Sequence, residues 1–228
     1  MNLRTDIKEK KEYILFILDK SGSMNSCKTQ TINGFNEQLQ ELNKTSDIKT
    51  FVSLVEFSSS VEIVFWNKPL EEVEYLNNET YEPNGSTAML DAVGQAVSKL
   101  KNDTHINDDD DVTFLVIIIS DGEENSSKEY NWNTVKDIIT ECKEESWTIT
   151  YMGSNQDLSE IQKRMNIYSG NTMSYTSTGI GTQTAFCAMA TSLGNYRNLR
   201  TNNTADDLAT SGIIQSFYSS SGTTADTI

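Results

Sequence analysis

The sequence predicts an α/β protein with a doubly wound, mostly parallel sheet, one antiparallel edge strand and helices on both faces. Apolar runs of strand length alternate along the chain with segments whose apolar residues recur every three or four positions. This alternation is typical of strands connected by helices that cover both faces of a sheet. One pair of strands departs from the pattern, because only three serines separate residues 51–57 from residues 61–66. So short a connection suits an antiparallel hairpin, which we place at an edge of the sheet.

In the first half of the chain we expect a strand, a helix, the hairpin and a second helix. The strand is the apolar run at residues 13–18, which is short and rich enough in β-branched residues to be buried on both faces. The second helix begins just after Thr87. Apolar residues at helical spacing mark the helices: Ile32, Phe35, Leu39 and Leu42 in the first, and Leu90, Val93, Val97 and Leu100 in the second.

The second half of the chain repeats the alternation. We expect strands at residues 114–119, 147–152 and 172–176, and the first of these is wholly apolar and therefore buried on both faces. A helix is predicted after each of the three strands. The apolar stripes of these helices are Val135, Ile138, Ile139 and Cys142, then Leu158, Ile161 and Met165, then Phe186, Met189, Leu193 and Tyr196.

The chain is expected to form one domain with two polar ends. Its 228 residues suit a single domain, which at this length buries about 70% of the surface of the unfolded chain. We place an N-terminal extension at residues 1–11, the domain at 12–199 and a Ser/Thr-rich tail at 200–228. The tail is expected to be flexible or ordered only by a partner. Its large apolar residues include Ile213, Ile214, Phe217 and Tyr218.

The formal net charge of −15 argues against two classes of partner. Nucleic acids and anionic membrane surfaces are both bound through clustered Lys and Arg, so neither is expected as a direct partner. The first apolar run is also too short for a signal-peptide core or a membrane span. We therefore expect a cytoplasmic protein, in the host cytoplasm if it is viral. An acidic protein partner would be repelled unless the contact is local or the partner is basic around its acid.

Zinc sites and disulfides are not expected. Cys27, Cys142 and Cys187 lack the close spacing of a zinc site, and His105 is the single histidine. We expect the cysteines to be small buried hydrophobic residues in a reducing compartment.

An acidic run occupies residues 107–111, between a predicted helix and a predicted strand. This position is at the N-terminal edge of the sheet, where we expect a solvated loop. The run lacks the alternating ligands and the glycine of an EF-hand loop, so a calcium site is the less favoured interpretation.

The most informative residues follow the first strand. Asp19, Ser21 and Ser23 bring a carboxylate and two hydroxyls into one turn, and Gly22 lets the chain fold tightly there. Ligands bind outside the carboxyl ends of the strands in doubly wound sheets, so the turn is placed for function. It is either a metal-binding turn or a structure that imitates one, because Asp and Ser after a strand also make Asx turns and helix caps.

Two further oxygen donors stand in similar contexts. Thr87 lies in a Gly-Ser-Thr loop ahead of a helix, and Asp121 ends an apolar strand. Hydroxyl and carboxylate oxygens are hard ligands, which suit Mg²⁺ or Mn²⁺, allow Ca²⁺ and reject soft-ligand chemistry. Five such side chains, some acting through water, would leave a coordination position open on an octahedral ion.

In their order along the chain, these motifs resemble the von Willebrand factor A (vWA) domain family. The resemblance rests on Asp-x-Ser-x-Ser, the Gly-Ser-Thr loop and Ile-Ser-Asp-Gly-Glu-Glu, and it covers about residues 10–197. It implies a Rossmann-like vWA fold with an intact metal-ion-dependent adhesion site (MIDAS). The members of that site would be Asp19, Ser21, Ser23, Thr87 and Asp121. The resemblance further implies that the hydroxyls bind the metal and that the aspartates hold waters. The chain is similar to standalone vWA proteins of bacteria and phages.

The resemblance implies a non-enzymatic protein interaction module, in which the cation binds an Asp or Glu of a partner protein. An enzyme is the less favoured alternative. A Mg²⁺-dependent phosphohydrolase would use Asp19 as the nucleophile, but the residue two positions later is Ser21 and not the acid that general acid catalysis there would use.

A third alternative is a self-assembling scaffold that uses its tail. Asp206, Asp207 or Asp226 would then offer an acid to a neighbouring copy. Glu123 and Glu124 lie just past Asp121, after Gly122. We expect them on the solvated surface, where they are also placed to modulate the ion or contact a partner.

Overall fold

The computed structural model describes residues 9–45, 47–104, 111–154 and 156–219. Its strands are β1 (Lys10–Asp19), β2 (Lys49–Phe57), β3 (Val61–Pro69), β4 (Asp111–Ser120), β5 (Thr148–Ser154) and β6 (Thr172–Tyr175). They form one six-stranded sheet in the order β3–β2–β1–β4–β5–β6. The β2–β3 pair is antiparallel, and the other neighbouring pairs are parallel. This arrangement confirms the predicted fold class and places the hairpin strand β3 at an edge.

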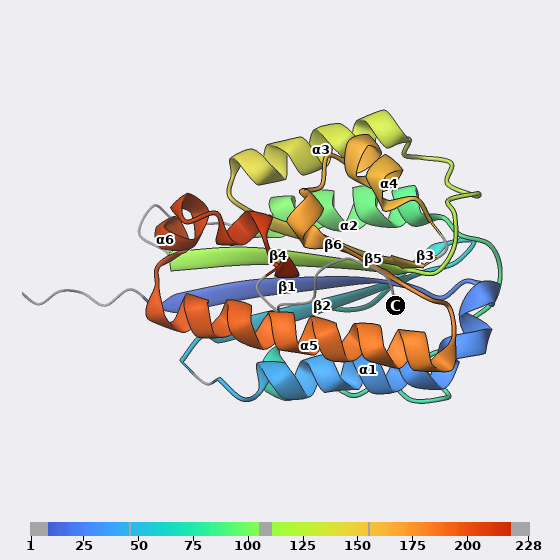
Figure 1. The fold of residues 1–228 in the computed structure, drawn as a ribbon, viewed down its shortest axis with the longest axis horizontal. Coiled ribbons are helices and arrows are strands. Elements are labelled where there is room, and N and C mark those ends of the chain that lie inside the picture. The colour runs from blue at the N-terminus through green and yellow to red at the C-terminus, as the bar shows by residue number, and fades with distance from the viewer. Residues whose placement is uncertain (1–8, 46, 105–110, 155, 220–228) are drawn as a thin grey trace, which may run out of the picture.

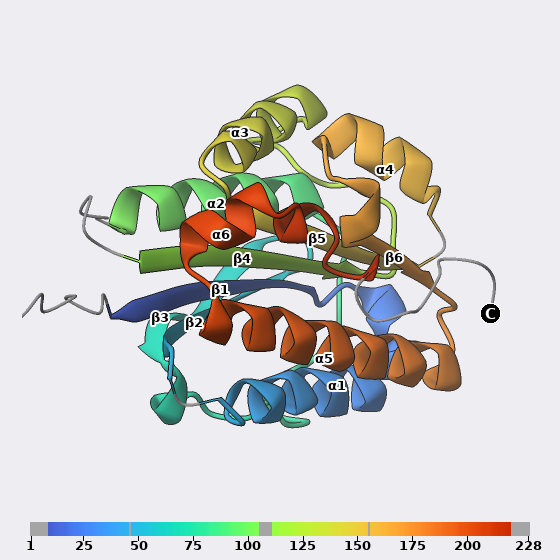
Figure 2. The ribbon, with the colours of Figure 1, turned by 60° about the vertical axis from the view of Figure 1, so that its left-hand side comes forward.

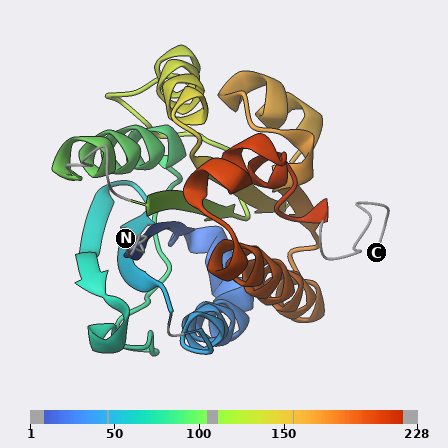
Figure 3. The same cartoon turned by 90° about the vertical axis from the view of Figure 1, so that its left-hand side faces the viewer.

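Helices cover both faces of the sheet (Figure 1). One face carries α1 (Lys28–Leu42) and α5 (Gly179–Asn202), and the other carries α2 (Met89–Asp103), α3 (Trp132–Glu144) and α4 (Leu158–Met165). The end-on view in Figure 3 separates these layers. A short helix, α6 (Ala205–Thr210), follows α5, and short 3-10 helices lie at Gly22–Cys27, Leu70–Glu72, Ser169–Asn171 and Ile213–Gln215.

Each central strand contributes to two hydrophobic cores, because successive side chains point to opposite faces. Phe16 and Leu18 pack under α1 and α5, while Leu15 and Ile17 pack under α2 and α3. The side chains of β1 from Ile14 to Leu18 are at most 1% exposed. The sequence at residues 13–18 is therefore apolar without interruption, because helices cover this strand on both faces of the sheet.

The sheet begins earlier in the chain than the sequence predicted. Lys10 and Lys11 belong to β1 and pair with Asp111 and Val112 of β4. The N-terminal extension at residues 1–11 is therefore wrong for these two residues, and residues 1–8 lie outside the described part of the chain.

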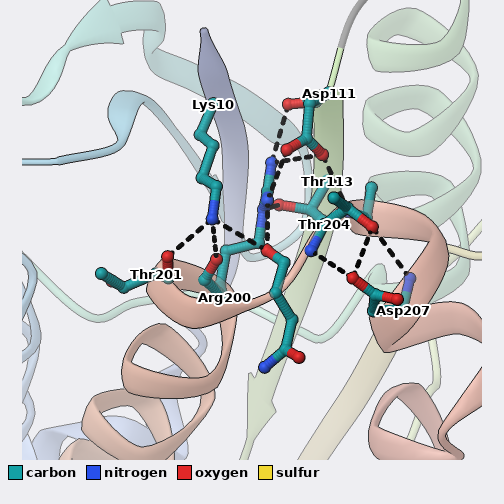
Figure 4. Close-up of polar contacts among 9 residues, drawn as sticks. Lys10, Asp111, Thr113, Arg200, Thr201, Thr204 and Asp207 are labelled. Carbon is teal, nitrogen blue, oxygen red and sulfur yellow. Dashed lines mark hydrogen bonds and ion pairs between the residues drawn. The ribbon is translucent and has the colours of Figure 1, made fainter. Parts of the chain in front are cut away.

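Asp111 corrects the interpretation of the acidic run. It is buried at the start of β4, and its Oδ1 lies 2.9 Å from Nη2 of Arg200, which is itself buried (Figure 4). A charged carboxylate is buried at acceptable free energy only when it is paired, and Arg200 supplies the partner from α5. The expected solvated loop is thus wrong for Asp111, while His105 and residues 107–110 lie outside the described residues.

The C-terminal arm, residues 203–219, packs on the domain and is not a flexible tail. Leu208, Ile214, Phe217 and Tyr218 are buried in the same core as α1 and α5. Figure 2 shows α6 and the turn after it beside α5, on the same face of the sheet. The prediction of a flexible tail is therefore wrong for residues 200–219. A few apolar side chains are enough to hold this segment on the domain, because part of a sheet face is open to receive them. Residues 220–228 lie outside the described part.

Polar contacts attach the arm at both of its ends. Lys10 Nζ donates hydrogen bonds to the carbonyls of Arg200, Thr201 and Asn203, which end α5 (Figure 4). Thr204 and Asp207 form a capping box that starts α6. Further along, the side chain of Asn171 donates to the carbonyl of Ile214 at 2.7 Å and accepts from the amide of Phe217 at 2.9 Å. One threonine of the Ser/Thr-rich arm, Thr204, thus serves as a helix cap.

The cysteines only partly follow the expectation. Cys27 and Cys142 are buried thiols, but Cys187 is exposed on α5, and the three are free of disulfides. Within the described residues, no helix is both long enough and apolar enough to cross a bilayer.

Candidate metal centre

The candidate site lies where the strand order reverses. The chain winds from β1 outward to β2 and β3, then returns to β4 on the other side of β1. Asp19 is the last residue of β1, and Asp121 follows the last residue of β4. Because β1 and β4 are adjacent and parallel, with Leu18 opposite Ile119, both acids reach the same crevice. Crevices of this kind, at the carboxyl edge of the sheet, are where doubly wound proteins bind ligands.

Four of the five predicted residues form a continuous chain of contacts. Oδ1 of Asp19 accepts a hydrogen bond from the backbone amide of Ser21 at 2.7 Å. The hydroxyl oxygens of Ser21 and Ser23 are 2.9 Å apart. The Ser23 hydroxyl donates to Oδ1 of Asp121 at 2.6 Å. The turn after β1 and the end of β4 therefore present one cluster of oxygens.

Thr87, the fifth predicted residue, reaches the same cluster from the loop before α2. A Cβ atom built on Gly122 would lie 3.4 Å from Oγ1 of Thr87 and 3.5 Å from Oγ of Ser23. The two hydroxyls therefore stand on the same side of Gly122. The backbone of Thr87 is held by Asn125, whose Oδ1 accepts from the Thr87 amide at 3.0 Å and whose amide donates to the Thr87 carbonyl at 3.1 Å.

Helix capping does not account for these hydroxyls. Ala88 is the N-cap of α2, and Ser21 is the N-cap of the 3-10 turn that follows it, and neither makes a side-chain capping bond. Asp19 does make an Asx-type contact with the amide of Ser21. The hydroxyls of Ser21 and Ser23 instead point toward each other.

Backbone contacts hold the Thr87 loop against the Asp19 turn. The amide of Gly22 donates to the carbonyl of Gly85 at 3.0 Å, and the amide of Asn84 donates to the carbonyl of Lys20 at 2.8 Å. Gly85 has a φ of +76°, a left-handed conformation that side chains disfavour. The phenolic hydroxyl of Tyr81 donates to the carbonyl of Asp19 at 2.5 Å. Two loops far apart in sequence are thereby locked together around the site.

Both carboxylates of the site are poorly hydrated. Burial raises the pKa of Asp19 to about 6, although hydrogen bonds from Ser120 and Ser21 oppose this shift, and nearby Asp121 adds to it. Burial also raises the pKa of Asp121. Two negative groups that have lost water favour a cation between them. The electrostatics therefore suit a metal ion.

The spacing of the oxygens also fits a small divalent cation. At a metal–oxygen distance of about 2.1 Å, neighbouring ligands of an octahedral ion lie about 3.0 Å apart. The oxygens of Ser21 and Ser23 are separated by 2.9 Å. Ser23 is exposed, so the cluster is open to solvent on one side. Among the described residues no group of three or more His, Cys, Asp or Glu is gathered for a metal, which leaves a donor set rich in neutral hydroxyls.

Several supporting residues were not predicted from the sequence. The hydroxyl of Ser120 donates to Oδ2 of Asp19 at 2.6 Å, and Ser177 lies 3.3 Å from Oδ2 of Asp121. Ser120 is adjacent to Asp121 in the sequence, which is the only signal that marked it. Ser177 carries none, because it comes from the loop before α5.

Glu124 has a structural role. Its Oε2 accepts from the amide of Leu90 at 2.9 Å in the first turn of α2, and its Oε1 accepts from the amides of Ser126 and Ser127. The expectation of a solvated side chain is wrong for Glu124, because these amides need an acceptor. Glu123 is exposed, as expected.

Fold and site together define an α/β domain with an oxygen-rich crevice at the switch point of its sheet. The von Willebrand factor type A domain family matches residues 14–186. The chain therefore belongs to this family. Among curated proteins, no significant sequence match is found.

Solved structures of other vWA proteins share the fold. The proximal thread matrix protein 1 of the mussel byssus, with a zinc-occupied MIDAS motif, has a TM-score of 0.56 at 17% identity over 80% of this chain and 45% of its own. The manganese-loaded TRAP protein of Plasmodium vivax has a TM-score of 0.50 at 15% identity, covering 78% of this chain and 73% of its own. The pilus adhesin SpaC of Lactobacillus rhamnosus GG has a TM-score of 0.57 at 14% identity, covering 81% and 30%. This chain thus spans less than half of the mussel and Lactobacillus proteins.

Proposed function

We propose that the protein is a non-enzymatic, metal-dependent protein interaction module. A divalent cation would be held by Asp19, Ser21, Ser23, Thr87 and Asp121, and it would bind an Asp or Glu of a partner protein. The observation that carries this proposal is the unbroken set of contacts from Asp19 through Ser21 and Ser23 to Asp121. The zinc-occupied MIDAS motif of the mussel protein and the manganese-loaded state of the Plasmodium protein support a divalent ion between Asp19 and Asp121.

The donor set favours Mg²⁺, with Mn²⁺ and Ca²⁺ as alternatives, because its ligands are hard oxygens. When bound, the ion would supply a strong positive charge, since Ser21, Ser23 and Thr87 are neutral. The residues of this chain orient the oxygens and leave the Ser23 side open. A carboxylate from a partner would then find an attractive position that the domain itself does not fill.

The charges near the site limit the kind of partner. Lys20, next to Asp19, is already paired with Glu56 at 2.7 Å and Glu62 at 2.8 Å. It therefore offers little attraction to an incoming acid, and the chain as a whole carries a net charge of −15. We infer a partner whose acidic residue is surrounded by Lys or Arg, so that long-range attraction brings it to the metal.

Thermal unfolding in EDTA, Mg²⁺, Mn²⁺ and Ca²⁺ tests the metal site. A ligand at about 100 times its dissociation constant adds about 2.7 kcal/mol to the free energy of unfolding. We expect this gain in the wild type and its loss in Ser23→Ala. The matched control is Ser26→Ala, one turn further on, whose exposed hydroxyl donates a hydrogen bond to the Ser23 carbonyl. No gain with any of the ions, or an equal gain in both variants, would contradict the proposal.

The partner is tested by affinity capture from cell extracts in Mg²⁺ and in EDTA. Proteins bound only in Mg²⁺, and lost in Ser23→Ala but not in Ser26→Ala, support the interaction module. Partners that bind equally with both variants contradict it. Turnover of a phosphate ester that requires Asp19 would favour the phosphohydrolase alternative.

Location and self-association belong to the same proposal. Free thiols and the acidic composition support the cytoplasm of a bacterium or of a phage-infected host. Self-assembly through the arm is less favoured, because Phe217 and Tyr218 are already buried on their own domain and Asp207 caps α6. Asp226 lies outside the described residues. A monomeric mass in light scattering, with and without Mg²⁺, would exclude self-assembly.

A further inference from the structure

A second hollow lies between α3 and α4, apart from the candidate metal centre. Its volume is about 520 Å³, and it is lined by Asn131, Trp132, Asn133, Lys136, Lys163 and Arg164. We call it the Trp132 hollow. Cavities that hold small ligands have volumes of about 300 to 1,000 Å³, so its size suits a small molecule.

The Trp132 hollow concentrates positive charge on an acidic protein. Acidic residues outnumber Lys and Arg by 33 to 18 in the whole chain, yet every charged residue that lines this hollow is basic. Arg164 pairs with Glu160 at 3.1 Å. Within the described part of the chain, Lys136 and Lys163 lie in no ion pair, although Lys163 acts at longer range on Asp157 and helps to lower its pKa. The hollow therefore keeps cationic groups that no carboxylate neutralises by direct contact.

An aromatic ring lies among these cations. The guanidinium of Arg164 stands over the ring of Trp132, 4.6 Å from its centroid. The guanidinium is thus held between the ring and Glu160, which keeps it ordered. Lys136 follows Trp132 by one turn of α3 and therefore projects from the same face of the helix. The arrangement offers a flat stack of guanidinium on ring, bordered by the ammonium groups of Lys136 and Lys163.

These features select the class of ligand. A long polyanion would extend past the hollow onto the acidic surface. Its charges more than about 8 Å from the lysines would be screened from them at physiological ionic strength, so they would gain no attraction there. A compact anion senses mainly the local charge. Two lysines without an ion-pair partner among the described residues exceed what one carboxylate needs, whereas a phosphate chain carries several charges. The guanidinium of Arg164, held flat on Trp132, suits a planar base.

We propose that the Trp132 hollow binds a mononucleotide. Its base packs on the Arg164 guanidinium that lies over Trp132, and its phosphates contact Lys136 and Lys163. This site is independent of the proposed metal centre, because neither its residues nor its ligand involves the crevice at Asp19 and Asp121. Binding is therefore expected to persist in EDTA.

Titration with ADP in EDTA, followed by tryptophan fluorescence and by calorimetry, tests this site. We expect saturable binding, with adenosine and pyrophosphate each binding more weakly because each lacks half of the contacts. The double variant Lys136→Glu, Lys163→Glu should weaken ADP binding by at least about tenfold, since it removes two charge-assisted contacts. The matched control is Lys99→Glu, because Lys99 also lies over a tryptophan, 5.0 Å from the centroid of the Trp66 ring, but does not line the Trp132 hollow.

The outcomes separate the possibilities. ADP binding that the double variant loses and Lys99→Glu keeps supports the proposal. Absence of ADP binding at millimolar concentration, or equal binding by wild type and double variant, overturns it. If pyrophosphate binds as tightly as ADP, the base adds nothing to the affinity, and the proposed contact with the base is overturned. Unchanged circular dichroism of the variants shows that their fold is retained.

Discussion

The hydroxyl of Ser120 donates a hydrogen bond of 2.6 Å to Oδ2 of Asp19, joining the ends of two adjacent parallel strands. Oδ1 of the same carboxylate accepts from the amide of Ser21 at 2.7 Å. Both oxygens of Asp19 therefore have donors, one from β4 and one from its own turn. The orientation of this buried acid depends on Ser120, which is itself no member of the predicted site.

Ser120→Ala is expected to weaken metal binding while the five proposed ligands remain. Residues that orient metal ligands typically change affinity by about 10- to 100-fold when they are removed. The measurement is the Mg²⁺ dependence of thermal unfolding, with Ser26→Ala as the control. Equal Mg²⁺ affinity in Ser120→Ala and the wild type would show that Ser21 alone orients Asp19.

Gly85→Ala is expected to destabilise the protein more than Gly212→Ala. Both glycines have left-handed conformations, with φ of +76° and +77°. A Cβ on Gly85 would lie 2.5 Å from Oγ of Ser59, whereas a Cβ on Gly212 would meet nothing within 4 Å. We expect a loss of about 1 kcal/mol at Gly212 from conformation alone, and about 0.5–1.5 kcal/mol more at Gly85, because the Ser59 hydroxyl must move and give up its hydrogen bond from the Ser86 amide. Urea unfolding measures both, and equal losses would contradict the clash.

Phe217→Ala tests whether the C-terminal arm is part of the folded domain. Phe217 is 1% exposed and packs against Tyr196 of α5, with ring centroids 5.9 Å apart. Truncating a buried phenylalanine costs about 3–5 kcal/mol. Gln215→Ala, on an exposed residue of the same arm, should stay within about 0.5 kcal/mol of the wild type. A loss below about 1 kcal/mol for Phe217→Ala in urea unfolding would mean that the arm is loosely attached.

Glu12 and Arg197 form a buried ion pair at the amino edge of the sheet. Their charged atoms are 2.7 Å apart, and the side chains are 0% and 1% exposed. Glu12→Gln should cost about 3–5 kcal/mol, because it leaves the guanidinium buried without a counter-charge. The double variant Glu12→Leu, Arg197→Met should lose less stability than the sum of the losses in Glu12→Leu and Arg197→Met alone. Additive losses in urea unfolding would show that the two charges do not interact.

Cysteine modification should distinguish Cys187 from the buried thiols. Partial burial and the neighbouring Glu37 carboxylate raise the pKa of Cys187, so less thiolate is present at neutral pH. We expect maleimide labelling that is slow at neutral pH, speeds up as the pH rises, and is faster in Glu37→Gln. Cys142, whose pKa burial raises to about 12, should react only after unfolding. Equal labelling of both thiols in the native protein would contradict the buried position of Cys142.

The sequence predicted the elements of the fold well where the signal is local. Apolar runs located the strands, stripes located the helices, and the short serine connection identified the β2–β3 hairpin. Asp19 and Asp121 were placed at one edge because the carboxyl ends of neighbouring parallel strands coincide. The prediction failed where a residue's role depends on a distant partner, as for Asp111 with Arg200 and for Phe217 with the core.

By itself the sequence determined the order of strands and helices and the presence of five oxygen donors in three short motifs, because both follow from residue types at fixed local spacing. Only the tertiary structure decided how those donors meet, that Ser120 orients Asp19, and that the C-terminal arm closes over the sheet. Ser120 lies 101 residues from Asp19, and Arg200 lies 89 residues from Asp111. Pairings at such separations leave no periodic trace in the sequence, since they are created when the strands assemble side by side.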